Sequence, residues 1–325
     1  MSLDADHIVD RRRMRRKLTY WRVFAVCFAA VAIVALTLAA NSPSGFGGAG
    51  PYIARVTIDG LIRTDRDRME ALERLGRSSA ARAVVVHINS PGGTTAGSEQ
   101  LHDALKRLKE KKPIVVVVDG LAASGGYIAA IAADHIVAQS SSLVGSIGVL
   151  FQYPNFAELM KTVGVSVESI KSSPLKASPN PFEPTTPQAR AAIESIVMDS
   201  YAWFRDLVRD NRKLEGAELD RIADGRVFTG RQGLELKLLD ELGEEKEAIA
   251  WLAKEKGIDA KLPVRDYDLE AGLRNLSFLH VAAANVLDAV GLTSLARQIK
   301  DWGTVRAIES LNLDGLLALW HPSTN

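Results

Sequence analysis

Apolar and polar positions between residues 51 and 138 alternate in blocks that predict strands and helices in turn. Apolar, largely β-branched runs occupy residues 53–58, 83–88, 114–118 and 135–138. Stretches with the apolar spacing of helices lie between them, at residues 67–77, 95–109 and 125–133. Continuous apolar strands that alternate with helices are typical of a mostly parallel sheet with helices on its faces. The pattern therefore predicts an α/β fold.

The pattern changes beyond this region. Prolines interrupt the chain and predict a loop, at Pro174, Pro179, Pro181, Pro184 and Pro187. An amphipathic helix is expected from about residue 186 to residue 212, and residues 225–243 are expected to form a strand, a helix and a strand. Two or three helices with apolar faces are expected between residues 275 and 319.

A long apolar segment precedes the predicted sheet. Residues 21–40 carry one charge, Arg22, and follow a basic block at residues 11–17. Twenty helical residues rise about 30 Å, the thickness of a hydrocarbon core. A cleaved signal peptide is the alternative, but its apolar region is shorter and Leu38-Ala-Ala40 is a poor cleavage site. The pattern predicts a single-pass anchor whose basic N-terminus stays in the cytoplasm.

The expected organisation follows from this anchor. It comprises a cytoplasmic N-terminus (1–19), a transmembrane anchor (20–40), a flexible spacer (41–50), a globular domain (51–267) and a C-terminal helical extension (268–325). The protein is expected in the inner (cytoplasmic) membrane of a Gram-negative cell, with the globular domain in the periplasm.

Composition excludes several kinds of function. The chain has 40 basic and 39 acidic residues, so its net charge gives no sign of nucleic-acid binding. Cys27 is the single cysteine and lies in the apolar segment, which leaves the globular domain without a disulfide or a cysteine nucleophile. The sequence contains no recognisable ligand set for a metal or a nucleotide cofactor, and we expect neither.

Two glycine-rich turns carry the candidate chemistry. Ser124 lies between the apolar run at residues 114–118 and a small-residue helix that starts at Gly125. A serine on such a turn projects its hydroxyl, and the helix start offers free N–H groups, as a nucleophile and an oxyanion hole require. Asn89-Ser-Pro-Gly-Gly93 follows the neighbouring strand and would bring further N–H donors to the same edge of the sheet.

The general base is not evident from the pattern. His87 lies within a predicted strand, His102 on an expected exposed helix face, and His135 at the start of a strand, so a structural role is favoured for each. A lysine can replace histidine as the base of a serine nucleophile. Lys171 and Lys176, in the proline-rich loop, are both candidates, and Ser146 is expected near the same cleft.

Several motifs in series resemble the bacterial signal peptide peptidase A family. They are Asn89-Ser-Pro-Gly-Gly93, Ala123-Ser-Gly-Gly-Tyr127, Ala132-Ala-Asp134, Gly145-Ser-Ile-Gly-Val149, Ile170-Lys-Ser172 and Gly225-Arg-Val-Phe-Thr-Gly-Arg-Gln232. The resemblance spans residues 53–267, and the single motif set is similar to the short form of the family. It implies a ClpP/crotonase-like fold, a membrane-anchored serine–lysine endopeptidase, and a homo-oligomeric ring that cleaves remnant signal peptides and other apolar peptides.

The same resemblance implies a role for each site residue. Ser124 matches the nucleophile, Lys176 the general base and Ser146 the serine that orients the lysine, while Gly92 or Gly93 with Gly125 would form the oxyanion hole. The family usually has Gly-x-Tyr before the lysine, and this chain has Ser173-Pro-Leu instead. That departure leaves open a catalytically silent ring-forming membrane scaffold. A crotonase-like acyl-CoA enzyme and a ClpP-like protease with a Ser-His-Asp triad are further alternatives.

Overall fold

The computed structural model describes residue 21, residues 50–269 and residues 316–319. The chain divides after Gly50 into two units, and the account below concerns the second, Pro51–Asn325. Within the described residues, none of the helices has both the length and the apolar content needed to span a membrane. Apart from Trp21 and Gly50, the predicted anchor and spacer lie outside the described residues.

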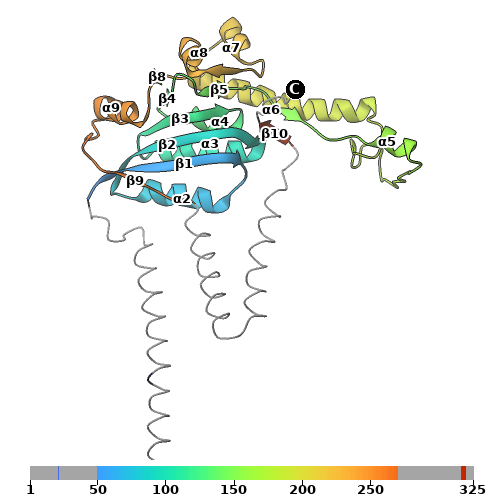
Figure 1. Cartoon of the computed structure of the whole chain (residues 1–325), viewed down its shortest axis with the longest axis horizontal. Coiled ribbons are helices and arrows are strands. Elements are labelled where there is room, and N and C mark those ends of the chain that lie inside the picture. Colours follow the sequence, from blue (N-terminus) through green and yellow to red (C-terminus); the bar gives the residue numbers. More distant parts are fainter. Residues whose placement is uncertain (1–20, 22–49, 270–315, 320–325) are drawn as a thin grey trace, which may run out of the picture. The chain divides into compact units, whose positions relative to one another are not determined.

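The described strands form one ten-stranded sheet that is largely parallel. Its centre consists of β1 (Tyr52–Ile62), β2 (Ala81–Thr94), β3 (Ile114–Ala123) and β4 (His135–Ala138), paired in that order (Figure 1). Short strands β9 (Val264–Asp266) and β8 (Glu241–Leu242) extend it beyond β1 and β4. The predicted α/β fold with a mostly parallel sheet is confirmed.

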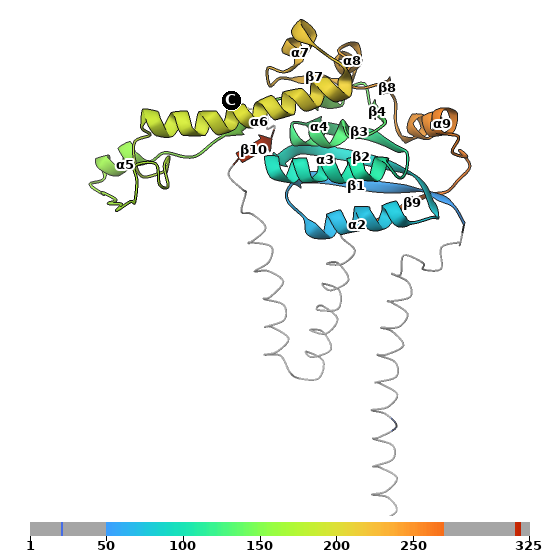
Figure 2. The same cartoon turned by 180° about the vertical axis from the view of Figure 1, so that it is seen from behind.

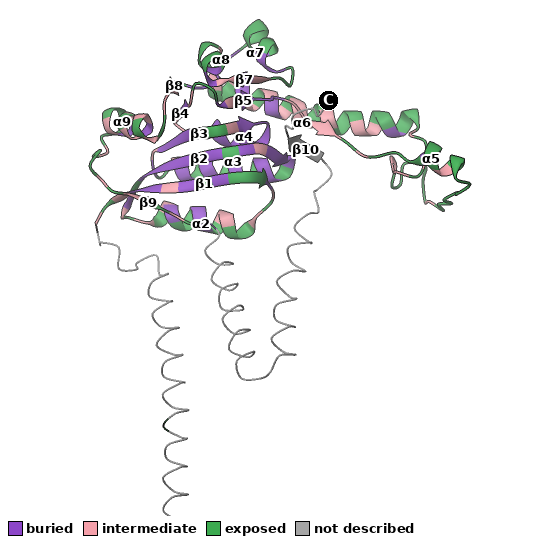
Figure 3. Ribbon diagram, viewed as in Figure 1, coloured by how far each residue is buried: buried purple, intermediate pink, exposed green. Residues whose placement is uncertain are grey.

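The connecting helices cover the two faces of this sheet unequally. Side chains of α2 (Arg66–Arg77), α3 (Thr95–Lys109) and α4 (Gly125–Ala130) build the larger core with one set of strand residues. Helix α9 (Glu245–Lys256) covers a smaller apolar cluster formed by the alternate residues of the same strands (Figure 3). Because successive strand residues point to opposite faces, continuous apolar runs such as Ile114–Val118 supply both cores.

The sheet opens at the carboxyl ends of its two central strands. β2 and β3 are paired as far as Ser90 and Ala122 and then diverge. On its other side β3 pairs with β4 and then, from Leu121 to Ala123, with β5 (Leu143–Gly145), which in turn pairs with β7 (Val227–Thr229). β2 pairs instead with β10 (Leu316–Leu319), which runs antiparallel to it and to β6 (Leu150–Phe151). Ligand sites of open α/β sheets lie where neighbouring strands separate in this way.

The chain after β6 leaves the body of the molecule. Helix α5 (Ala157–Thr162) and the loop that follows it lie at the far end of α6 (Pro187–Arg212), away from the central sheet (Figures 1 and 2). Thr186 caps α6 by accepting a hydrogen bond from the Ala189 N–H at 3.1 Å, and Pro187 follows at the first helical position, which fixes where the helix begins. Helices α7 (Gly216–Ile222) and α8 (Gly230–Glu235) complete the described elements.

Two expectations from the sequence require correction. Residues 316–319 form the strand β10, where a helix was predicted, because the edges of β2 and β6 provide backbone partners there; residues 270–315 lie outside the described part of the chain. His102 is buried, not exposed, since its helix α3 packs against α4 and its Nδ1 lies 2.8 Å from the Ile128 carbonyl oxygen.

A charged network joins α9 to the sheet. Glu245, at the first turn of α9, accepts hydrogen bonds from the Arg55 guanidinium, with the Nη2 group at 2.7 Å, and lies 2.8 Å from His87 Nε2. His87 Nδ1 also lies 2.9 Å from the Asp119 carboxylate. The Arg55 and His87 hydrogen bonds hold the pKa of Glu245 below its ordinary value.

We expect Glu245→Gln to lower the free energy of unfolding at pH 7 by about 1–3 kcal/mol, because Arg55 and His87 lose a charged acceptor. A carboxylate with a lowered folded pKa stabilises the fold above its unfolded pKa of about 4.3 and loses this effect as pH falls through the folded value. The difference in the free energy of unfolding between wild type and Glu245→Gln, measured by urea denaturation, should therefore be smaller at pH 3. Asp266→Asn is the control, because Asp266 contacts the same arginine from an exposed position; an undiminished Glu245→Gln difference at pH 3 would contradict the prediction.

Candidate active site

Ser124 occupies a strained turn between β3 and α4. Its backbone angles are φ 53 and ψ −115, which few residues other than glycine adopt. Its N–H donates to the Gly145 carbonyl at 2.7 Å, so β5 fixes the turn from the neighbouring strand. The Tyr127 and Ile128 N–H groups donate to the Ser124 carbonyl, so Gly125 and Gly126 carry the N–H groups that have no acceptor within α4. A serine on a sharp strand-to-helix turn is how several hydrolases present a nucleophile.

The last residues of β2, which the sequence predicted as a turn after the strand, pack directly against the Ser124 turn. A Cβ on Gly126 would lie 2.7 Å from the Ser90 carbonyl oxygen, so only glycine allows α4 to approach so closely. The Ser90 hydroxyl donates to the Gly60 carbonyl at 2.6 Å and accepts from the Gly92 N–H at 3.1 Å. The Gly92 N–H is therefore already engaged, whereas Gly93 lies in the part of β2 that follows the opening of the sheet. Sequence reasoning did not identify Ser90, although Asn89-Ser-Pro contains it.

Ser146 and Gly148 lie on the other side of Ser124. The Ser124 hydroxyl is 3.5 Å from the Gly148 carbonyl oxygen. Ser146 is buried, has a positive φ of 52, and donates its N–H to the Arg226 carbonyl at 2.8 Å. The structure thus places Ser124, Ser146 and the Gly92–Gly93 end of β2 at the carboxyl ends of the central strands, and Gly92 and Gly93 continue the strand where a turn was predicted.

The two candidate lysines lie elsewhere in the chain. Both belong to the loop between α5 and α6, which projects from the body of the molecule (Figure 2). Lys171 forms an ion pair with Glu183 and holds the pKa of that carboxyl below its ordinary value. Lys176 is exposed, and the described part of the chain offers its ammonium group no ion pair. One copy of the chain therefore does not bring Lys176 to Ser124, and its role as the base stays a prediction.

The buried polar groups near Ser124 support α4. The Tyr127 hydroxyl donates to the Leu238 carbonyl at 2.8 Å, and burial raises the pKa of this phenol. Burial also lowers the pKa of His102, so its imidazole is neutral and donates to the Ile128 carbonyl. The His135 ring stacks on Trp251 with centroids 4.6 Å apart. Within residues 50–269, Tyr127, His102 and His135 therefore have structural contacts, and a structural role is what the sequence favoured for the two histidines.

The described residues contain no group of three or more histidine, cysteine or acidic side chains that could hold a metal ion. The polar groups at the turn are instead a hydroxyl and backbone N–H donors, which suit the attack on a carbonyl and the stabilisation of the oxyanion that forms.

Comparison with known proteins identifies the family. The profile of Peptidase family S49 matches residues 106–259, and that of Clp protease matches residues 63–142. A Synechocystis protein named "Putative protease" is 37% identical over 209 residues, which cover 64% of this chain and 75% of that protein. The chain belongs to peptidase family S49. It is also 30% identical to Protease 4 of Haemophilus influenzae over 207 residues, covering 61% of this chain and 34% of Protease 4.

A further relative is the Serine protease SPPA, chloroplastic, of Arabidopsis thaliana, which is 30% identical over 224 residues, covering 69% of this chain and 32% of that protein. Membership of peptidase family S49 and these relatives confirm the prediction of a serine peptidase. The resemblance to the signal peptide peptidase A family is confirmed with it.

We expect Gly126→Ala to disrupt this S49 site, because the added Cβ meets the Ser90 carbonyl and α4 must shift. The free energy of unfolding should fall by about 1–3 kcal/mol. Labelling of Ser124 by a small fluorophosphonate, followed by mass spectrometry, should slow by at least about tenfold. Gly50→Ala is the matched control, since a Cβ there has nothing within 4 Å. Unchanged labelling of Gly126→Ala would show that the close approach is not needed.

Proposed function

We propose that this chain is a membrane-anchored serine endopeptidase that cleaves remnant signal peptides and other apolar peptides through a Ser124–Lys176 dyad. The observation that carries the proposal is the buried, strained turn at Ser124, which begins α4 at the opening of the sheet and leaves the serine hydroxyl without a capping bond to that helix. Ser146 is proposed to orient the lysine amine, as the family resemblance implies.

The proposed reaction uses the groups around this turn. Ser124 Oγ attacks the scissile carbonyl while a neutral Lys176 amine takes its proton. The N–H groups of Gly125 and Gly93 stabilise the oxyanion; Gly92 is the weaker candidate because its N–H is held by the Ser90 hydroxyl. The protonated lysine then donates to the leaving amine, and water hydrolyses the ester between Ser124 and the acyl group.

The position of β10 supports an extended peptide as the substrate. β10 lies antiparallel to Gly92–Thr94 on one side and to β6 on the other, so these two backbone edges accept an added strand next to Ser124. Peptides commonly bind to sheet edges in this way. A substrate strand would take the place of β10, and the chain's own C-terminal residues would compete with it.

Lys176 requires a second copy of the chain in this proposal. The segment that carries it exposes large apolar side chains, at Phe156, Leu159, Val163, Val165, Val167, Ile170, Leu175 and Phe182. Exposed apolar surface of this extent marks an interaction site. We propose that it packs on a neighbouring copy in a homo-oligomeric ring and brings Lys176 to the neighbour's Ser124.

The last part of the proposal concerns how the protein is attached to the membrane. The apolar segment at residues 20–40, after its basic block, is proposed to anchor the protein in the inner membrane with the catalytic domain in the periplasm. Signal peptides left in the bilayer after cleavage would then be held at the same membrane as the enzyme.

We expect Ser124→Ala and Lys176→Ala each to abolish peptide cleavage, and an equal mixture of the two, assembled together, to regain about a quarter of the wild-type rate. Random assembly pairs an intact serine with a neighbour's intact lysine in about that share of sites. The rate is measured with a fluorogenic apolar peptide.

Lys171→Ala is the matched control and should stay active, because Lys171 is already paired with Glu183. A mixture without activity would contradict a lysine supplied by a neighbour. Loss of cleavage in Lys171→Ala alone would move the general base to that residue.

We also expect removal of residues 316–325 to lower KM for a peptide substrate by about threefold or more and to leave kcat unchanged, because β10 no longer occupies the substrate strand position. Steady-state kinetics on the truncated and the full-length chain measure both parameters. An unchanged KM would show that the peptide binds elsewhere.

A further inference from the structure

One peptide group connects the Ser124 turn to the segment that follows α7. The carbonyl of Gly145 accepts the Ser124 N–H at 2.7 Å, and the N–H of the next residue, Ser146, donates to the Arg226 carbonyl at 2.8 Å. Both groups belong to the peptide bond between Gly145 and Ser146, which is planar and directs its C=O and N–H in opposite directions. The Arg226 carbonyl therefore constrains the orientation of the group that holds Ser124.

The Gly145–Ser146 peptide needs support because both of its residues have unusual backbone angles. Gly145 has a φ of 99 and Ser146 a φ of 52, and a positive φ costs free energy in a residue with a side chain. On one side, β7 pairs with β5 and places Phe228 against Gly145, where a Cβ would lie 3.1 Å from the Phe228 ring. Packing thus fixes the Gly145 end of the peptide, and the bond to the Arg226 carbonyl holds the Ser146 end.

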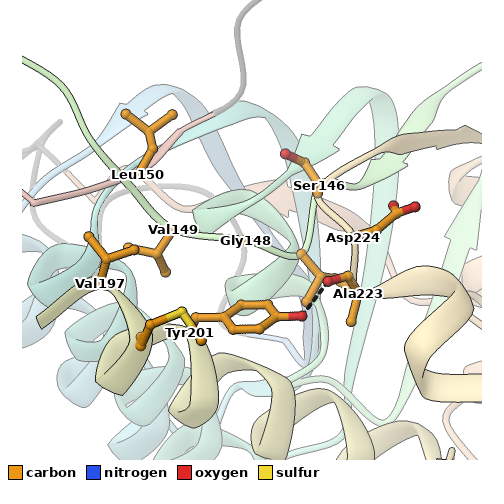
Figure 4. Close-up of a pocket in the computed structure, with 11 residues that line it drawn as sticks. Ser146, Gly148, Val149, Leu150, Val197, Tyr201, Ala223 and Asp224 are labelled. Atoms are coloured by element: carbon orange, nitrogen blue, oxygen red, sulfur yellow. Dashed lines mark hydrogen bonds between the residues drawn. The ribbon is translucent and has the colours of Figure 1, made fainter. Parts of the chain in front are cut away.

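Asp224 fixes the backbone of Arg226 from the other side. Its Oδ1 accepts the Arg226 backbone N–H at 3.1 Å and the Arg226 Nε–H at 2.9 Å. Gly225, between them, has a φ of 89, and a Cβ on it would have nothing within 4 Å. The turn is therefore held by the Asp224 carboxylate and not by packing at Gly225. In Figure 4, Asp224 lies beside Ser146 on the wall of one cavity, and its carboxylate points away from Tyr201.

The exposure of this ion pair separates its effect on local geometry from its effect on stability. The side chains of Asp224 and Arg226 are 37% and 64% exposed. Ion pairs this exposed contribute little to the stability of a fold. A displaced nucleophile, in contrast, can lose rate by a factor of about 100 for a shift of about 1 Å. Loss of the Asp224 carboxylate should therefore reduce catalysis and leave the global fold in place.

We infer that Asp224 is a positioning residue for Ser124. It closes the turn at Gly225 and thereby fixes the Arg226 carbonyl. That carbonyl orients the Gly145–Ser146 peptide, which in turn holds the backbone of the nucleophile in the geometry of the proposed reaction. The inference rests on the proposed function of Ser124, but Asp224 is not required to touch the substrate.

The test compares Asp224→Ala with Asp224→Asn in the full-length chain. Asparagine keeps an Oδ1 that can accept the Arg226 N–H, whereas alanine removes it. With a fluorogenic apolar peptide, Asp224→Ala should lower kcat by at least about tenfold with KM unchanged, and Asp224→Asn should stay within about threefold of wild type. Asp259→Ala is the matched control, because Asp259 Oδ1 accepts the Lys261 N–H at 2.9 Å in the same kind of turn, between α9 and β9.

Amide hydrogen exchange, followed by mass spectrometry, is a second measurement that does not need cleavage. Peptides that contain Ser124 and Ser146 should exchange at least about tenfold faster in Asp224→Ala than in wild type, because the bonds that protect their N–H groups are loosened. Peptides from β1 and β4 should exchange at the wild-type rate. Faster exchange in β1 and β4 as well would show a loss of global stability and would overturn the positioning role.

The outcomes separate this inference from the proposed function. If wild type cleaves the peptide and Asp224→Ala keeps the wild-type kcat, or changes KM alone, the positioning role is wrong and the peptidase stands. An equal loss of kcat in Asp224→Asn would likewise overturn the inference. If wild type cleaves no peptide, the proposed function fails and the exchange measurement decides. Faster exchange confined to the Ser124 and Ser146 peptides would then support the role of Asp224, and unchanged exchange would overturn it.

Discussion

The separation of β2 from β3 after Ser90 and Ala122 is the constraint on which the site depends. Parallel strands satisfy each other's backbone groups only while they remain adjacent, so the side of β2 that faced β3 needs a new partner once they part. On its opposite side β3 pairs first with β4 and then with β5, which fixes the Ser124 N–H to the Gly145 carbonyl. β2 is left with an edge that another strand can occupy. The separation of β2 and β3 thus leaves a place for an extended peptide, beside a nucleophile turn that β5 holds from the other side of β3.

The strain at Ser124 is maintained by the packing of α4. A serine at φ 53 costs free energy that the surrounding contacts must offset. Gly126 lets the helix approach Ser90, while the hydrogen bonds of Tyr127 and His102 fix its other faces. Because these groups are buried and satisfied, they hold one geometry of the turn and exclude alternatives. The many small residues of this helix follow from its burial, since α4 is covered by β2, α3 and α6.

The sequence predicted the central sheet well because its signal is local. The runs at 83–88 and 114–118 are apolar on both faces apart from His87, and their β-branched residues and short length favour a buried parallel strand. Ser124 and Gly92–Gly93 were singled out for the same reason, since each follows such a run, although Gly92 and Gly93 continue β2 and do not form a separate turn. The strand at 316–319 and the burial of His102 were not, because both depend on partners far along the chain: β10 on the edges of β2 and β6, and His102 on the Ile128 carbonyl. The residues of an apolar segment do not by themselves show whether the segment will pair with a sheet edge as a strand or form a helix.

The proposal takes Ser124 from one copy of the chain and Lys176 from a neighbouring copy, and this arrangement has a physical consequence. Ser124 belongs to the most buried part of the fold, whereas Lys176 belongs to a segment whose large apolar side chains are exposed in a single copy. Within that copy, few tertiary contacts oppose the conformational entropy of this segment. Packing on a neighbour would bury its apolar surface, at about 25 cal/mol for each Å² removed from water, and would order the loop that carries the lysine. Proteolysis would then require assembly, and an isolated chain would hold a formed nucleophile without its base. Such an arrangement restricts peptide cleavage to the assembled enzyme by the same contacts that stabilise the assembly.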